Sequence, residues 1–165
     1  MSGAAVGVAK LLRICILSPR ASFQASPHCF LSLSDKHTLV AEIPGTLPQV
    51  HGDAMATDIM VGQLLENAFK YSPNGGTITV AARPAADWIE VTVDDEGIGI
   101  APGDHERIFE RFVQGETGDR RRFGGIGLGL YIVRQLARAQ DGEVAAASRP
   151  GGGTRMSLQL RRGAG

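Results

Sequence analysis

The apolar and polar positions of residues 53–72 predict an amphipathic helix. Asp53 stands where a helix N-cap is expected, and the Pro-Asn-Gly-Gly stretch at 73–76 ends the periodic pattern. Side chains three and four positions apart share one helix face, so an apolar stripe would press this helix onto a sheet. The stripe consists of Leu64, Leu65, Ala68 and Phe69.

Strand patterns lie on both sides of this helix. A strand is predicted from Thr38 to Ile43, and residues 77–82 and 88–93 alternate as the two strands of a hairpin. Glycine-rich residues 124–129 open a second helix that runs through Gln140. Its expected apolar stripe is Leu128, Ile132 and Leu136.

Two closing strands are predicted after the helix stop at Gly142. They span residues 143–148 and 154–160, with a glycine-rich connection between them.

The first 34 residues show no comparable periodicity. Val6 to Leu17 is fairly apolar, but Lys10 and Arg13 interrupt it and it is too short to span a bilayer. We expect residues 1–34 to form a poorly ordered segment, residues 35–162 to form one domain, and this chain to contain no membrane segment.

Composition places the chain among globular domains. Its 165 residues carry 17 basic and 17 acidic side chains, which gives a formal net charge of +0. Because a nucleic-acid surface needs a basic excess, no nucleic-acid partner is expected.

Polar side chains with chemical potential lie on the first helix. Gln63, Asn67 and Lys70 are spaced by one turn, and Glu66 neighbours Asn67, so these groups can share one face. A carboxylate, a carboxamide and an ammonium group suit a metal-bound phosphate chain. For this stretch alone, an ordinary solvated helix face is the competing interpretation.

Glycine-rich turns follow the hairpin and open the second helix. Asp95 stands at the mouth of the first turn, where Gly97 and Gly99 permit close backbone approach to a ligand. The dinucleotide fingerprint requires a glycine where the chain has Leu130, and no P-loop sequence occurs. Neither of these common nucleotide folds is supported.

Four motifs in order resemble the catalytic ATP-binding domain of bacterial two-component sensor histidine kinases. Residues 67–71, 95–99, 108–112 and 125–130 match the N, G1, F and G2 boxes of that family, and residues 151–154 resemble its last glycine box. The resemblance covers Asp35 to Leu160. It implies the two-layer α/β sandwich of gyrase and MutL-type ATPases, with a mixed β-sheet covered on one face by about three helices.

The resemblance also implies roles on the first helix. Asn67 is similar to the asparagine that holds magnesium, with Gln63 as a second candidate metal contact. Lys70 resembles a phosphate contact and Tyr71 a residue that flanks the nucleotide. Glu66 resembles the catalytic acidic residue, a base toward the phosphoacceptor histidine.

Asp95 resembles the aspartate that accepts a hydrogen bond from the adenine amino group. Guanine presents an oxygen at that position, so this carboxylate would select ATP over GTP. Residues 113–123 would form the ATP lid. The resemblance further implies ATP contacts from Gly97, Gly99, Ile100, Phe112, Gly125, Gly127, Leu128, Gly129 and Thr154.

The function implied is that of a cytoplasmic kinase domain using ATP and Mg²⁺. It would donate the γ-phosphoryl group to a histidine on a dimerisation and phosphoacceptor domain, in cis or in trans, with a response regulator downstream. None of His28, His37, His51 and His105 has the family's phosphoacceptor context, so we expect the chain to lack that domain. The alternative left open is an ATP-binding regulatory module, similar to anti-sigma-factor kinases or to a degenerate kinase half, that transfers no phosphate.

Overall fold

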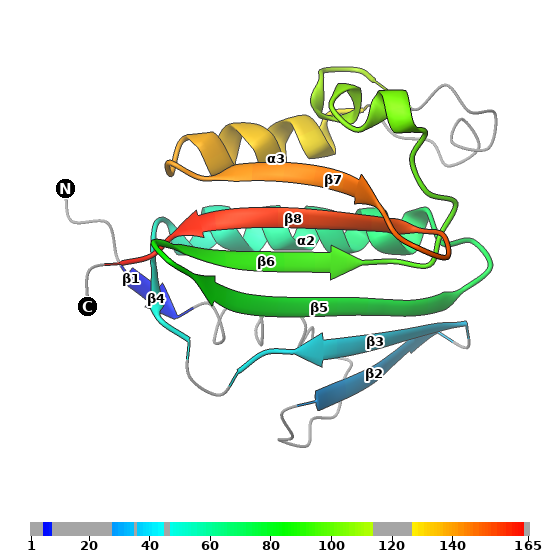
Figure 1. Cartoon of the computed structure of the whole chain (residues 1–165), viewed down its shortest axis with the longest axis horizontal. Coiled ribbons are helices and arrows are strands. Elements are labelled where there is room, and N and C mark those ends of the chain that lie inside the picture. The colour runs from blue at the N-terminus through cyan, green and yellow to red at the C-terminus, as the bar shows by residue number, and fades with distance from the viewer. Residues whose placement is uncertain (1–4, 8–27, 35, 45–46, 114–126, 164–165) are drawn as a thin grey trace.

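Helices and one mixed sheet form two layers in the computed structural model (Figure 1). The structure describes residues 5–7, 28–34, 36–44, 47–113 and 127–163. The described strands are β1 (Ala5–Gly7), β2 (His28–Ser34), β3 (His37–Glu42), β4 (Gln49–His51), β5 (Gly76–Ala85), β6 (Trp88–Asp94), β7 (Glu143–Ser148) and β8 (Thr154–Arg161). The described helices are α2 (Ala54–Lys70), α3 (Gly129–Arg138) and two short 3-10 turns, η1 (Pro102–Asp104) and η2 (Arg107–Phe109).

The helix α2 forms as its sequence predicts. The Asp53 side chain accepts a hydrogen bond from the Ala56 N–H at 2.7 Å, which satisfies one of the free amides of the first turn. Leu64, Leu65 and Ala68 are buried, and Phe69 packs at the edge of the same core. The predicted apolar stripe on this helix is therefore confirmed.

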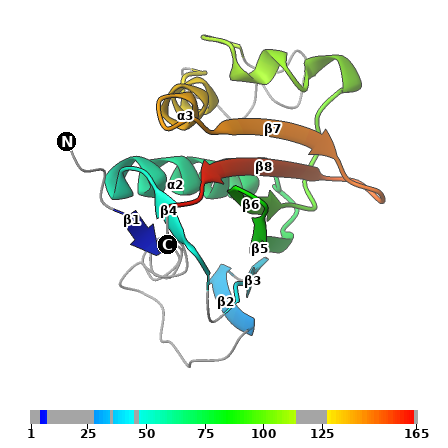
Figure 2. The same ribbon diagram turned by 60° about the vertical axis from the view of Figure 1, so that its left-hand side comes forward.

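The main sheet has the strand order β2-β3-β5-β6-β8-β7. β3 and β5 are parallel, whereas the other neighbouring pairs are antiparallel. Parallel neighbours need a crossover connection, and α2 lies within the one that joins β3 to β5. Figure 2 shows α2 and α3 on the same side of the sheet, so the two-layer mixed α/β class is confirmed. The described residues contain two α-helices rather than about three.

The helix α3 packs beside α2 with a face that differs in part from the one predicted. Val133 and Ala137 are its buried residues, while Ile132 is 42% exposed. Of the predicted stripe, Leu136 packs against the core and Leu128 is half-buried, whereas the prediction is wrong for Ile132. At the end of α3, the Gln140 side chain accepts a hydrogen bond from the Asp53 N–H at 2.7 Å.

Three strands, β1, β2 and β4, lie where the sequence pattern predicted no element. β2 pairs with β3, and β1 pairs with β4. Residues 28–34 form a strand through this pairing, and the expectation that residues 1–34 are poorly ordered stays a prediction. The division of the chain at residue 34 stays a prediction. No helix in the described part of the chain is long and apolar enough to cross a membrane.

Ion pairs connect α3 to β7. Arg138 Nε donates to Glu143 Oε2 at 2.9 Å, and Arg134 Nε lies 3.5 Å from Glu143 Oε1. Burial alone would raise the pKa of Glu143, but the hydrogen bonds from the Val144 N–H and from Arg138, with the charges of Arg138 and Arg134, lower it below 4.5. The carboxylate therefore stabilises the fold above its unfolded pKa, and this contribution is lost as the pH falls through its folded pKa.

Replacement Glu143→Gln is expected to lower the free energy of unfolding near neutral pH by less than about 1 kcal/mol, because the pair is partly exposed. The difference from the parent should vanish in acid below the folded pKa, where the parent carboxylate is protonated. Urea unfolding at neutral and acid pH measures both values. A loss of equal size at every pH would contradict the ion-pair assignment, and the exposed Glu110→Gln gives the baseline.

Candidate functional site

The candidate site is a small cavity between the last turn of α2 and the adjoining ends of β6 and β8. Asp94 ends β6 and pairs with Arg155 near the start of β8, so the residues on either side of this pair meet at one edge of the sheet. Five of the residues predicted from the sequence line this cavity together, and three apolar neighbours complete it. The lining consists of Asn67, Ala68, Tyr71, Asp95, Ile100, Leu130, Thr154 and Met156.

Asp95 is fixed in place by backbone groups. It is 5% exposed, and its Oδ1 accepts hydrogen bonds from the Gly97 N–H at 2.8 Å and the Thr154 N–H at 3.2 Å. Its own N–H donates to the Thr154 carbonyl at 2.9 Å. A buried carboxylate needs such partners to offset its desolvation, and here they also set its direction. The carboxylate is therefore oriented before any ligand arrives.

Asn67 brings an incompletely bonded amide to the same cavity. Its Nδ2 is buried and makes no hydrogen bond within the described structure. A buried polar atom without a partner costs free energy, so a ligand that completed its bonding would be favoured. A carboxamide can present its NH₂ group to a phosphate oxygen or, turned over, its oxygen to a hard cation such as Mg²⁺. The residue thus fits the metal and phosphate role predicted for it.

The other predicted side chains of α2 lie around Asn67. Gln63 Nε2 donates to Glu66 Oε2 at 3.3 Å, and Glu66 is exposed. Lys70 is half-buried, with its Nζ 5.3 Å from the centroid of the Tyr71 ring. Gln63, Glu66 and Lys70 are therefore beside the cavity, not among the residues that line it.

Two glycines allow the loops of the site to pack against one another. A side chain at Gly97 would collide with the Tyr71 carbonyl, which accepts a hydrogen bond from the Ile98 N–H at 2.9 Å. Gly153 has φ +88° and lies so close to Asp95 that a Cβ would meet the Asp95 carbonyl. The loop after β6 is thereby held against both α2 and the start of β8.

The predicted second glycine motif lies at the N-terminus of α3. Leu128 is the N-cap residue of the helix, and a Cβ at Gly129 would meet the Gln63 side-chain oxygen. The helix start is thus next to the polar face of α2. Free amides at such a start can hold phosphate groups.

Phe112 is one of the predicted contacts that do not line the cavity. Its ring is 68% exposed, its φ is 61°, and its N–H donates to the Gly127 carbonyl at 3.0 Å. Gly99, with φ +73°, lies in the loop that leads to Ile100. Gly125 and residues 114–123 of the predicted lid lie outside the described residues.

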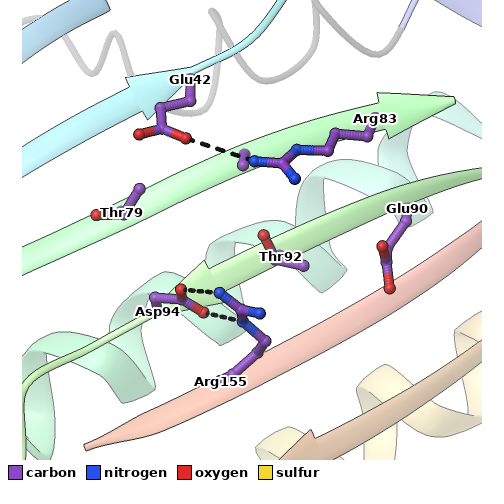
Figure 3. Close-up of a pocket in the computed structure, with 8 residues that line it drawn as sticks. Glu42, Thr79, Arg83, Glu90, Thr92, Asp94 and Arg155 are labelled. Carbon is purple, nitrogen blue, oxygen red and sulfur yellow. Dashed lines mark hydrogen bonds and ion pairs between the residues drawn. The ribbon is translucent and has the colours of Figure 1, made fainter. Parts of the chain in front are cut away.

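The polar face of the sheet carries a separate charged cluster (Figure 3). Arg155 donates to both carboxylate oxygens of Asp94, at 2.7 and 2.6 Å, which raises the pKa of Arg155. Arg83 lies 3.8 Å from Glu42 across neighbouring strands. None of the predicted site residues lines this hollow. Each of these arginines thus pairs with a carboxylate on a neighbouring strand.

Besides the three apolar lining residues, sequence reasoning missed Arg149, in the connection between β7 and β8, which contacts Asp95. Its Nη1 donates to the Asp95 carbonyl at 2.6 Å. The two residues are far apart in the chain, and no motif spacing marks the pair. Only the meeting of β6 with β8 brings them together.

Comparisons with known proteins agree with this geometry. A sequence model of the family described as "Histidine kinase-, DNA gyrase B-, and HSP90-like ATPase" matches residues 52–164. The sensor-like histidine kinase SenX3 of Mycobacterium bovis is 42% identical over 112 residues, which is 68% of this chain and 27% of that protein. The histidine protein kinase DivJ of Caulobacter vibrioides is 36% identical over 149 residues, which is 88% of this chain and 24% of that protein. The chain therefore spans about a quarter of the length of these relatives.

Solved structures are similar over the same region. The chain superposes on full-length ShkA, solved in complex with AMPPNP, with a TM-score of 0.75 at 26% identity, covering 98% of this chain and 32% of that one. The ATP-binding domain of PrrB from Mycobacterium tuberculosis gives a TM-score of 0.68 at 20% identity, covering 99% of this chain and 100% of that one. The second likeness concerns the fold alone.

Proposed function

Because the chain belongs to the family of histidine kinase-, DNA gyrase B- and HSP90-like ATPases, we propose that it binds Mg-ATP and donates the γ-phosphoryl group to a histidine. The observation that carries the proposal is the pairing of a pre-oriented carboxylate, Asp95, with an unsatisfied carboxamide, Asn67, in one cavity. The first group suits an adenine amino donor and the second suits phosphate or a metal ion. Both are chemically matched to the two ends of ATP.

Adenine recognition would rest on Asp95. Its carboxylate accepts hydrogen bonds only, so it favours the amino group of adenine and repels the carbonyl oxygen of guanine. Ile100 and Met156 provide apolar surface for the base, and Thr154 fixes the carboxylate through its N–H. Selection for ATP over GTP then follows from one oriented group.

The phosphates would lie between α2 and the start of α3. Asn67 and Lys70 can contact them from α2, and the free amides after Leu128 add donors. When bound, Mg²⁺ neutralises charge on the phosphate oxygens. The amide oxygen of Asn67 would hold it, with Gln63 as a second candidate. Positioning and charge neutralisation are the main contributions that such a site makes to phosphoryl transfer.

The transfer itself would use Glu66. An imidazole nitrogen forms a bond to the γ-phosphorus as the bond to the oxygen bridging to the β-phosphate breaks, and ADP departs with that electron pair. Glu66 is exposed beside Asn67, where it can accept the imidazole proton. The histidine would belong to a dimerisation and phosphoacceptor domain, in cis or in trans, with a response regulator receiving the group next. We place this activity in the cytoplasm, where ATP is supplied.

Incubation with γ-labelled ATP and magnesium tests the proposal. The chain alone is not expected to become labelled, because no histidine is among the residues that line the cavity. His37 Nε2 is hydrogen-bonded to the Ser72 carbonyl at 2.8 Å, and the two ring nitrogens of His105 contact Pro102 and Ser148 at 3.1 Å. Phosphoacceptor hairpins from related sensor kinases should gain acid-labile label when the full chain is added.

Two controls test whether the label reflects transfer to a histidine and whether that transfer uses Glu66. A hairpin whose histidine is replaced by alanine should remain unlabelled, and Glu66→Gln should bind ATP while transferring about 10²-fold more slowly. Binding of ATP without label on any hairpin would favour the regulatory module instead of the kinase. Label on the chain itself would contradict the assignment of its histidines.

A further inference from the structure

Arg149 reaches from the β7–β8 connection back to the end of β6. Its backbone closes the connection, with its N–H donating to the Gly153 carbonyl at 3.2 Å. Its side chain is 27% exposed. The guanidinium donates through Nη1 to the Asp95 carbonyl at 2.6 Å, and its Nε lies 3.8 Å from Asp94 Oδ2. One side chain thus contacts two consecutive residues at the point where the chain enters the candidate site.

The loop that Arg149 supports has little packing on its outer side. A hollow of about 370 Å³ is lined by residues 97–101 of the loop together with Ser148, Arg149, Gly152 and Gly153. The candidate ATP cavity borders the same loop from the other side and shares Ile100 with this hollow. On the side of this hollow the loop has open space beside it, so directed hydrogen bonds add to the close approach of Gly97 and Gly153 in determining its position. The bond from Arg149 to the Asp95 carbonyl is one of these.

We propose that Arg149 is a positioning residue for adenine recognition, acting through the main chain of Asp95. This inference rests on the proposed function. The Asp95 carboxylate accepts from the Gly97 and Thr154 N–H groups, and its direction therefore depends on where its own backbone lies. Arg149 fixes that backbone at the Asp95 carbonyl through a charge-assisted hydrogen bond. A displaced backbone would misdirect the carboxylate without removing it.

The neighbouring arginine provides a matched control. Arg155 binds the Asp94 carboxylate at 2.7 and 2.6 Å, on the polar face of the sheet. Like Arg149, Arg155 forms an ion pair with Asp94 (Figure 3). Of these two arginines, Arg149 is the one that donates to the Asp95 carbonyl in the described part of the chain. Arg149→Gln and Arg155→Gln therefore remove the same charge next to the same aspartate. Only Arg149→Gln should change the preference for ATP over GTP.

Calorimetric titration of the full chain with ATP and with GTP tests this inference. Arg149→Gln should weaken ATP binding about 10-fold, because a charge-assisted bond is lost, and should lower the ratio of ATP to GTP affinity. Arg155→Gln should leave both affinities within about twofold of the parent. Arg149→Lys should recover part of the ATP affinity, since an ammonium can reach one acceptor but lacks the guanidinium fork.

A double-mutant cycle separates positioning from general destabilisation. In the Asp95→Asn background, Arg149→Gln should cause little further loss of ATP affinity, because both changes act on one group. Equal losses in the two backgrounds, or equal effects of Arg149→Gln and Arg155→Gln, would overturn the inference. Failure of the parent to bind ATP would overturn the proposed function as well, whereas binding sensitive to Asp95→Asn but not to Arg149→Gln would overturn the inference alone. Thermal melts verify folding, and Arg149→Lys carries the test if Arg149→Gln does not fold.

Discussion

The substitution Asn67→Ala is expected to abolish magnesium-dependent ATP affinity and to slow phosphoryl transfer by about 10²-fold or more. Asn67 supplies the one carboxamide that lines the cavity, and its buried Nδ2 makes no bond within the described structure. Titration with ATP in magnesium and in a chelator measures the first effect. Transfer to an added phosphoacceptor hairpin measures the second.

The fold should survive this change. Removing a buried, unsatisfied polar group is close to neutral or stabilising, and alanine has the highest intrinsic helix propensity. The melting temperature should therefore equal or exceed that of the parent. Gln135→Ala, at an exposed position of α3, should alter neither binding nor transfer. Parental transfer by Asn67→Ala would mean that this side chain is only part of the helix surface.

The second large effect is expected at Asp95. Asp95→Asn should weaken ATP binding by about 1.5–3 kcal/mol, because a charge-assisted acceptor becomes a neutral amide. Asparagine retains one oxygen for the Gly97 and Thr154 N–H groups, so the loop should keep its position. Its NH₂ group would face the base and could donate to guanine. The preference for ATP over GTP should therefore shrink.

Calorimetry with both nucleotides decides this prediction. Glu90→Gln makes the same carboxylate-to-amide change on the polar face of β6 and should leave ATP affinity unchanged. Unchanged ATP affinity in Asp95→Asn, or GTP binding by the parent as tight as ATP binding, would exclude Asp95 as the adenine acceptor.

Local patterns were sufficient for the central part of the fold. The helix from Asp53, the hairpin of β5 and β6 and the strands β7 and β8 follow the predicted ranges closely. In each case the signal is periodicity within a short window, together with a cap or a glycine stop. β1, β2 and β4 were not predicted. β1 and β4 have three residues each, too few for a periodic signal, and they pair with each other across a long separation in the chain. In β2, which pairs with the adjacent β3, the alternation Leu31-Ser32-Leu33-Ser34 is a strand signal that was missed.

The candidate site shows the same difference between what local sequence signals predict and what only the folded arrangement determines. Asn67 and Asp95 could be identified because motif order supplied information that periodicity lacks, and the fold brings them to one cavity. Phe112 belongs to a matching motif but lies in solvent, since a motif does not specify the direction of a side chain. Arg149 belongs to no motif. Its hydrogen bond to the Asp95 carbonyl depends on the strand order β6-β8-β7, which was not predicted from the sequence.

Chemical-shift mapping with a non-hydrolysable ATP analogue and magnesium tests the central claim most directly. Backbone amide signals of Gly97, Ile100 and Thr154 should shift together with the side-chain amide of Asn67, as they adjoin one cavity. Signals of Arg83, on the opposite face, should stay in place. Shifts confined to residues outside the cavity, or none at nucleotide concentrations that saturate related kinases, would contradict the proposal that this cavity binds ATP.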